Sequence, residues 1–158
     1  MIDAAVAGRA LLMIAAASTA PWAVARVCGN RWTWPLDFDS TLWDGQRLFG
    51  AHKSWRGLVA GIAASALVGW AFGPGWLVGC GVGALALAGD VMSSAIKRRL
   101  SRPPGAEVPG LDQVPEALLP LLLFREPLGI SAATALMLTF VFTILDLFFT
   151  PLRHRRRG

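Results

Sequence analysis

The fold class follows from one segment, Trp76-Leu-Val-Gly-Cys-Gly-Val-Gly-Ala-Leu-Ala-Leu-Ala-Gly-Asp90-Val-Met-Ser-Ser-Ala-Ile-Lys97-Arg-Arg. It opens with a long apolar run and closes with basic residues. A helix over residues 76–96 can cross the hydrocarbon core of a bilayer, which needs about 20 residues. Of the 158 residues in the chain, 54% are apolar and only 16% are charged, whereas soluble domains carry about 25% charge. The sequence therefore excludes an ordinary soluble domain and predicts an all-α, polytopic integral membrane protein.

Four further apolar segments flank this helix, over residues 4–27, 57–72, 114–124 and 128–152. The first resembles a signal peptide, but Arg9 lies inside it and the apolar run continues past Ala20, so we expect a spanning helix. The segment at 114–124 is shorter than the roughly 20 residues of a full span. It is either a short helix that starts inside the protein or a re-entrant segment.

The expected organisation is a single domain over residues 1–158 with about five transmembrane helices. Two polar loops, at residues 29–56 and 97–113, connect these helices on one side of the membrane. Small residues at Gly57-x-x-x-Gly61 and Gly79-x-Gly81-x-Gly83 predict close packing between helices.

Lysine and arginine are distributed unevenly along the chain. All but Arg9 and Arg125 of the 15 basic residues fall within residues 26–56, 97–102 and 153–157. Cytoplasmic loops collect Lys and Arg. We therefore expect a plasma or inner membrane protein with its N-terminus outside and with both polar loops and the C-terminus in the cytoplasm. The same bias favours a crossing at the short fourth segment, because the tail would otherwise lie outside.

Asp90 is the most informative polar residue. It follows a long apolar run, so it is expected near the membrane boundary, where a carboxylate is costly unless it is paired or bound to a cation. Lys97 lies about two helical turns further on, on the same helix face, and could form a helix-end ion pair with it. The other interpretation is a metal or substrate site.

The two polar loops combine acidic and basic residues at one membrane surface. Carboxylates can hold Mg²⁺ through oxygen ligands, commonly together with substrate phosphates. Lys and Arg side chains can bind a polyphosphate and neutralise charge that develops during phosphoryl-type transfer. This combination indicates a soluble polyphosphate that meets a lipid.

Motifs in both loops carry a family resemblance. Gly50-Ala-His-Lys-Ser-Trp-Arg-Gly57 is similar to G-x-x-K-T-W-R-G, and the upstream Pro35-Leu-Asp-Phe and Asp44-Gly-Gln-Arg are similar to P-x-D-F and D-G-x-R. Gly89-Asp-Val-Met-Ser-Ser-Ala-Ile-Lys-Arg-Arg is similar to G-D-x-x-x-S-x-x-K-R-R, and Asp112-Gln resembles the start of D-Q-x-D. In this order and spacing, over residues 35–115, the motifs resemble those of the CDP-archaeol synthase family, which is related to the phosphatidate cytidylyltransferases.

The resemblance implies a CTP:lipid-phosphate cytidylyltransferase that releases pyrophosphate and uses Mg²⁺. The catalytic residues that it implies are Lys53, Arg56, Asp90, Lys97 and Asp112. The nucleotide- and phosphate-binding residues that it implies are Asp44, Arg47, Lys53, Ser54, Arg56, Ser94, Lys97 and Arg98. The metal ligands that it implies are Asp90, Asp112 and Glu116.

One position departs from the motifs. The second Asp of D-Q-x-D falls at Pro115, and Glu116 follows it. Either Glu116 substitutes from a shifted backbone, or the site is weakened. The alternative function is therefore a catalytically weakened homologue that binds nucleotide or lipid in the membrane.

The expected partners are CTP, a membrane lipid phosphate and the lipid bilayer, with no nucleic acid, while a homodimer stays open. A third hypothesis is a small transporter, because a charged residue in a spanning helix often marks a transport pathway. Two long polar loops on one side argue against it. The sequence does not identify the lipid.

Overall fold

The computed structural model describes residues 3–103, 106 and 108–154, and over these residues it contains six helices and no strand. The helices are α1 (Ala4–Cys28), α2 (Trp55–Phe72), α3 (Trp76–Arg99), α4 (Gln113–Leu123), α5 (Arg125–Leu128) and α6 (Ala132–His154). Isolated β-bridges join Pro35 to Ser54 and Thr41 to Arg47 within the first polar loop. The prediction of an all-α protein is confirmed.

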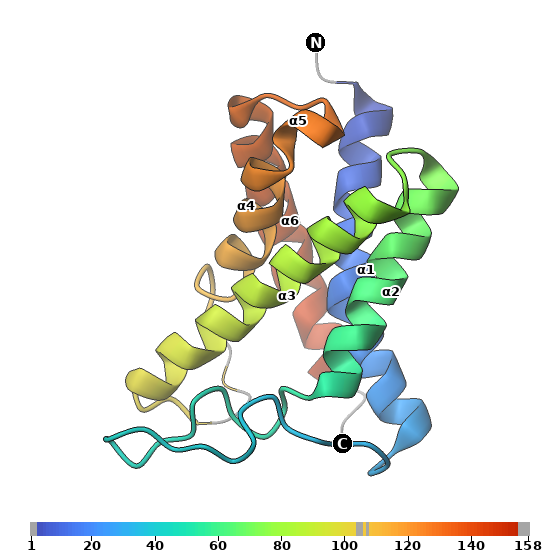
Figure 1. Cartoon of the computed structure of the whole chain (residues 1–158). Helices are drawn as coiled ribbons and strands as arrows, with labels where there is room; N and C mark the ends of the chain where they lie inside the picture. Colours follow the sequence, from blue (N-terminus) through green and yellow to red (C-terminus); the bar gives the residue numbers. More distant parts are fainter. Residues whose placement is uncertain (1–2, 104–105, 107, 155–158) are drawn as a thin grey trace.

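The helices run back and forth between two ends of a bundle (Figure 1). In the described part of the chain, α1, α2, α3 and the Ala132–Phe149 portion of α6 are long and apolar enough to cross a membrane. The shorter α4, followed by α5, returns the chain to the end where α1 begins. Both polar loops and the C-terminal end of α6 consequently lie at the opposite end (Figure 1). This arrangement matches the predicted multi-pass topology.

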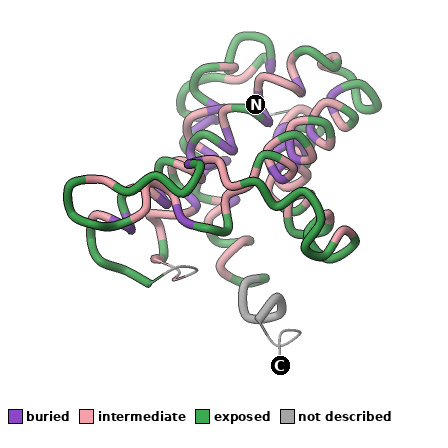
Figure 2. The backbone as a smooth tube through the Cα atoms, turned by 60° about the horizontal axis from the view of Figure 1, so that its bottom comes forward, coloured by how far each residue is buried: buried purple, intermediate pink, exposed green. Residues whose placement is uncertain are grey.

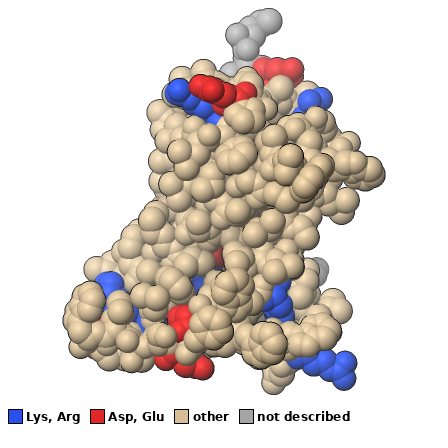
Figure 3. All heavy atoms as spheres, in the orientation of Figure 1, with Lys and Arg blue, Asp and Glu red and all other residues tan. Residues whose placement is uncertain are grey.

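Side chains on the surface divide the molecule into a central apolar belt and two polar ends. Figure 3 shows Lys, Arg, Asp and Glu gathered near the two ends of the visible face, with other residues between them. Exposed indoles mark both ends, with Trp34 and Trp43 in the first polar loop and Trp70 and Trp76 beside the turn from α2 to α3. Tryptophan is enriched at membrane–water interfaces. The belt between these levels is therefore the lipid-facing surface.

The core is built by the inward faces of the helices (Figure 2). Gly61 on α2 lies so close to α1 that an added Cβ would be 2.7 Å from the carbonyl oxygen of Ala17. On α3, a Cβ at Gly79 would be 2.5 Å from the backbone oxygen of Ser65 on α2. Only glycine permits such backbone approach, and the close packing predicted from the small residues is confirmed.

Two helix boundaries differ from the expected ones. The last crossing does not start at residue 128: Gly129 adopts a left-handed conformation (φ +67°), and α6 starts at Ala132. The Ser131 hydroxyl accepts a hydrogen bond from the Thr134 amide (3.1 Å), which favours a new helix start there. In addition, α3 continues to Arg99, so its three basic residues are helical rather than part of the second loop. Positive charge in the last turn is stabilised by the helix dipole.

Candidate active site

A pocket of about 670 Å³ lies where the first polar loop meets the ends of α1, α3, α4 and α6. Most of the residues that the sequence singled out line this pocket: Lys53, Ser54, Arg56, Asp90, Ser94, Lys97, Arg98, Asp112 and Glu116. They come from segments far apart in the sequence, and the crossing of α3 with α4 brings them together. Asp44 and Arg47 are not in the pocket wall.

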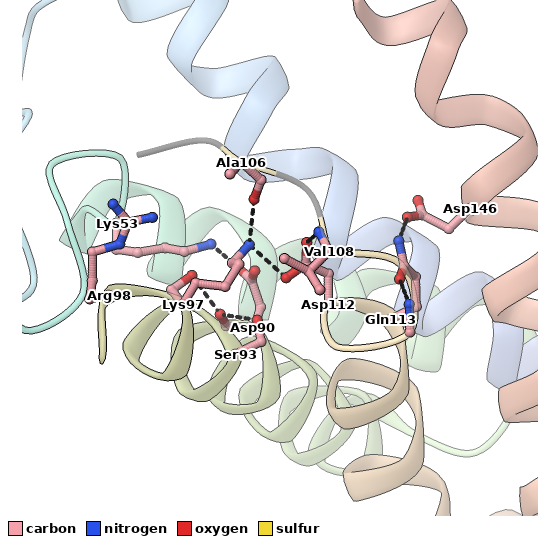
Figure 4. A network of polar contacts seen from close by, with 12 residues as sticks. Lys53, Asp90, Ser93, Lys97, Arg98, Ala106, Val108, Asp112, Gln113 and Asp146 are labelled. Carbon is pink, nitrogen blue, oxygen red and sulfur yellow. Dashed lines mark hydrogen bonds and ion pairs between the residues drawn. The ribbon is translucent and has the colours of Figure 1, made fainter. Parts of the chain in front are cut away.

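Asp90 forms an ion pair with Lys53 from the first loop, with 2.5 Å between Oδ2 and Nζ (Figure 4). Lys97, which the sequence offered as an alternative partner, is instead bonded to Asp112, so the alternative of a helix-end Asp90–Lys97 pair is wrong. The side chains of Lys53 and Asp90 are partly buried, at 23% and 30% exposure, which strengthens their attraction relative to a surface pair. Ser94 lies one turn beyond Asp90 and donates its hydroxyl to the Asp90 backbone carbonyl (2.8 Å).

Lys97 ties α3 to the second loop. Its Nζ lies 2.6 Å from Asp112 Oδ1 and donates to the Ala106 carbonyl (3.0 Å). Asp112 Oδ2 accepts a hydrogen bond from the Val108 amide (3.1 Å), so this carboxylate is held by both the helix and the loop. Two lysine–carboxylate pairs thus lie in one pocket. One of them includes a residue of the first polar loop, and the other includes a residue of the second.

Arg98 contributes a further cation to the pocket and is almost fully buried, with 5% exposure. One terminal nitrogen donates to the Pro103 carbonyl (2.7 Å). Its Nε has no hydrogen-bond partner among the described residues. A buried guanidinium with remaining donor capacity is suited to an anionic group, and phosphate oxygens accept such bonds well.

Asp37 organises the first loop. Its carboxylate accepts hydrogen bonds from Arg47 (2.6 Å) and from the amides of Asp39, Phe49 and Gly50 (3.1–3.2 Å). Burial alone would raise the pKa of Asp37, but these hydrogen bonds outweigh it and lower the pKa from 3.8 to about 2. The ionised carboxylate therefore fixes the backbone just before the Lys53 segment.

The remaining predicted residues of the first loop make structural contacts. Arg47 pairs with Asp37, and Asp44 pairs with Arg99 at the end of α3 (2.9 Å). Arg56 lines the pocket, but its guanidinium donates to backbone carbonyls at the end of α1 and just beyond it. Ser54 caps the start of α2 by accepting from the Gly57 amide (3.4 Å). The structure brings these four side chains to the loop framework rather than to the two lysine–carboxylate pairs.

Glu116 is a buried carboxylate on α4 that accepts a hydrogen bond from the Ser18 hydroxyl of α1. With Asp90 and Asp112 it provides oxygen atoms of the kind that Mg²⁺ prefers. No three His, Cys, Asp or Glu side chains within the described ranges are grouped closely enough to hold a metal by themselves. Mg²⁺ commonly binds through one or two carboxylates plus substrate phosphates, so these residues fit an ion that arrives with a phosphate ligand.

Several residues of the pocket wall were not assigned a role from the sequence, among them the polar residues Ser18, Gln113 and Asp146. Asp146 lies in the last apolar segment, and a carboxylate there was itself a signal, because such residues in spanning helices are commonly functional. Ser18 carried no comparable signal, and Gln113 stood out only as a member of the Asp112-Gln motif. Their roles depend on which helices pack together.

The fold and the pocket define a polytopic helical membrane protein with a charged, phosphate-compatible site at one end of its bundle. The family model for CDP-archaeol synthase matches residues 9–74. The chain is 34% identical to the CDP-archaeol synthase of Methanoregula boonei over 152 residues, which is 85% of this chain and 87% of that protein. It is 36% identical to the CDP-archaeol synthase of Methanosphaerula palustris, over 77% and 80% of the two chains. The chain belongs to the CDP-archaeol synthase family.

Other relatives match over less of their length. The CDP-archaeol synthase of Pyrococcus furiosus is 40% identical over 93 residues, which is 50% of this chain and 53% of that protein. The chain thus spans about half the length of this relative. A solved structure described as an intramembrane enzyme for archaeal membrane lipids biosynthesis superposes with a TM-score of 0.72 at 30% identity. That match covers 89% of this chain and 92% of the solved one, so the fold is shared over nearly the whole bundle.

Proposed function

We propose that this protein is a CTP:lipid-phosphate cytidylyltransferase, which forms a CDP-activated lipid and pyrophosphate. The observation that carries the proposal is that two ion pairs, Lys53–Asp90 and Lys97–Asp112, lie in one pocket at the end of an apolar bundle. Membership of the CDP-archaeol synthase family supports the same reaction. A pocket at the bundle's polar end is open to a soluble nucleotide, while the helices are in contact with lipid.

In the proposed reaction, an oxygen of the lipid phosphate attacks the α-phosphorus of CTP. A new phosphorus–oxygen bond forms, the bond from the α-phosphorus to the oxygen that bridges to the β-phosphate breaks, and pyrophosphate leaves with the bonding electrons. The lipid phosphate is already largely ionised at neutral pH, so no strong general base is required. The residues of the pocket therefore act mainly by positioning the reactants and neutralising charge.

The charges of the pocket wall support a role for a divalent cation. Its bases are Lys53, Arg56, Lys97 and Arg98, and its acids are Asp90, Asp112, Glu116 and Asp146. Their formal charges cancel, so an incoming triphosphate and lipid phosphate would add uncompensated negative charge. When bound, Mg²⁺ would neutralise phosphate oxygens and the leaving pyrophosphate, and Asp90 and Asp112, with Glu116 nearby, are the residues that would hold it.

Substrate binding exchanges the partners of both lysines. Lys53 and Lys97 neutralise Asp90 and Asp112 in the structure. With a cation held by these carboxylates, the two ammonium groups would bind phosphate oxygens, and the buried Arg98 would add hydrogen bonds from its planar guanidinium. The site is expected to face the cytoplasm, where CTP is available, with the N-terminus of the chain outside.

The test is pyrophosphate release by purified protein with CTP and a panel of lipid phosphates, with and without Mg²⁺. The panel contains an isoprenoid ether lipid phosphate, an acyl phosphatidate and a polyprenyl phosphate. Asp90→Asn is expected to lower turnover by roughly 10²–10³-fold. Glu126→Gln is the control, because Glu126 is an 85% exposed carboxylate outside the pocket. Wild-type protein that turns over none of the lipid phosphates would contradict the proposal.

A second candidate is a weakened homologue that binds CTP or lipid without turnover, and the observation that favours it is Pro115 at the position of the motif's second Asp. It predicts Mg²⁺-dependent CTP binding by calorimetry without pyrophosphate release. If the wild-type protein releases no pyrophosphate and Pro115→Asp does release it, this candidate is favoured over the first.

A further inference from the structure

Asp146 is a carboxylate in the last membrane-spanning helix. It lies on α6 within the apolar Ala132–Phe149 span, between the exposed Leu145 and Phe148 on a lipid-facing stretch, and yet it lines the charged pocket. A carboxylate in a membrane-spanning helix costs free energy unless it is paired with another polar group or serves a functional site. The motifs of the two polar loops do not include it, since it comes from a third part of the chain.

The contacts of Asp146 connect α6 to the second polar loop (Figure 4). Asp146 Oδ2 accepts a hydrogen bond from Gln113 Nε2 (3.1 Å). The other end of the same amide, Gln113 Oε1, accepts from the Gly110 backbone N–H (2.9 Å). Gln113 immediately follows Asp112, so Asp146 holds both the orientation of the Gln113 amide and the turn that presents the Asp112 carboxylate.

Pro115 stands where the D-Q-x-D motif that Asp112-Gln resembles would have its second carboxylate. The Pro115 backbone packs directly against α3 beside Asp90, because a Cβ added at Gly89 would be 2.3 Å from the Pro115 carbonyl oxygen. Glu116, one residue later, lines the same pocket as Asp90 and Asp146. Asp146 thus adds a carboxylate from α6 to the pocket that Asp90 and Asp112 also line.

We propose that Asp146 compensates for Pro115 as a positioning residue: it holds the Asp112–Gln113 turn and supplies the missing negative charge for binding of magnesium-bound CTP. This inference rests on the proposed function. Because Asp146 acts through Gln113 and Asp112, its loss affects the affinity for Mg²⁺ together with CTP more than it affects helix packing. Changing residues that orient metal ligands typically lowers metal affinity or activity by about 10–100-fold.

The experiment compares Asp146→Asn, Asp146→Glu and the double variant Asp146→Asn with Pro115→Asp. The readouts are the Mg²⁺ concentration that gives half-maximal turnover and the calorimetric affinity for CTP in the presence of Mg²⁺. Asp146→Asn is expected to raise the half-maximal Mg²⁺ concentration about tenfold. Asp146→Glu retains most of the affinity, and Pro115→Asp restores part of what Asp146→Asn loses.

Thr143→Val is the matched control on α6, because the Thr143 hydroxyl donates to the Thr139 carbonyl of its own helix and Thr143 is not in the pocket wall. The inference is overturned if Asp146→Asn leaves both readouts within twofold of wild type. It is equally overturned if Asp146→Asn lowers the melting temperature and turnover without moving the Mg²⁺ dependence, or if Pro115→Asp restores nothing. Wild-type protein that binds CTP with Mg²⁺ but never releases pyrophosphate would defeat the proposed function alone, since the calorimetric comparison still tests Asp146.

Discussion

Gly89→Ala changes a close contact between the backbones of α3 and α4. The new methyl group would lie 2.3 Å from the carbonyl oxygen of Pro115 and 2.7 Å from the amide nitrogen of Glu116. All of these neighbours are backbone atoms of the first turn of α4, so no flexible side chain can move aside. The substitution therefore has to push α4 away from α3.

The size of the effect follows from these distances. Ordinary contacts start at 3.4 Å, so α4 must shift by about 1 Å, and overpacking of this kind costs about 1–3 kcal/mol. For a chain of this length, each kcal/mol lowers the melting temperature by about 2–4 °C. The same shift separates Asp112 and Glu116 from Asp90, and a misplacement of 1 Å in a catalytic site can lower the rate roughly 10²-fold.

The assay is thermal unfolding in detergent together with cytidylyl transfer and calorimetric CTP binding. Gly8→Ala is the matched control, because Gly8 is also helical and an added Cβ there meets nothing within 4 Å. That variant is expected to be neutral or more stable by about 0.5–1 kcal/mol. If Gly89→Ala behaves like Gly8→Ala in all three measurements, the close α3–α4 contact and its role in assembling the pocket are refuted.

Three further predictions concern the first polar loop. The pKa of Asp37 is lowered to about 2, so its contribution to the free energy of unfolding is present above the ordinary pKa of 3.8 and is lost as the pH falls towards 2. Tryptophan fluorescence should report this transition in the wild-type protein. A transition that persists in Asp37→Asn would contradict the assignment. Arg99→Ala removes the bonds to Asp44 and to the loop backbone and should weaken CTP binding by up to about tenfold. The control Arg102→Ala should leave the calorimetric affinity for CTP unchanged. Equal effects of the two substitutions would argue against a role for the contact between Arg99 and the first polar loop. Arg56→Ala frees the carbonyls at the end of α1 and should lower the melting temperature by about 2–4 °C; unchanged stability with weaker CTP binding would instead indicate direct phosphate contact.

Much of the fold was predictable because hydrophobic length and charge are local properties. The apolar run before Asp90 predicts a spanning helix whatever surrounds it, and the distribution of basic residues predicts that both polar loops share one end. The break before α6 was missed, because Gly129 and Ser131 act through backbone conformation and a capping bond within an otherwise continuous apolar stretch.

The site was predictable as a set of residues but not as a set of contacts. The motifs named Lys53, Asp90, Lys97 and Asp112, and all four line one pocket. Helical spacing allowed a pair between Asp90 and Lys97, yet each of the two bonds a residue from a different segment. Spacing along one helix says nothing about a cation that a neighbouring loop brings closer.

The sequence by itself determined a membrane bundle with apolar spans, two polar loops and the residue types of a phosphate site, because these depend on composition and order along the chain. Only the tertiary structure decided which charges meet. The crossing of α3 with α4 pairs Lys97 with Asp112, the folded first loop brings Lys53 to Asp90, and the packing of α6 against α4 adds Asp146. An ion pair requires approach to a few ångströms, and in a helical membrane protein that distance is set by how the backbones pack.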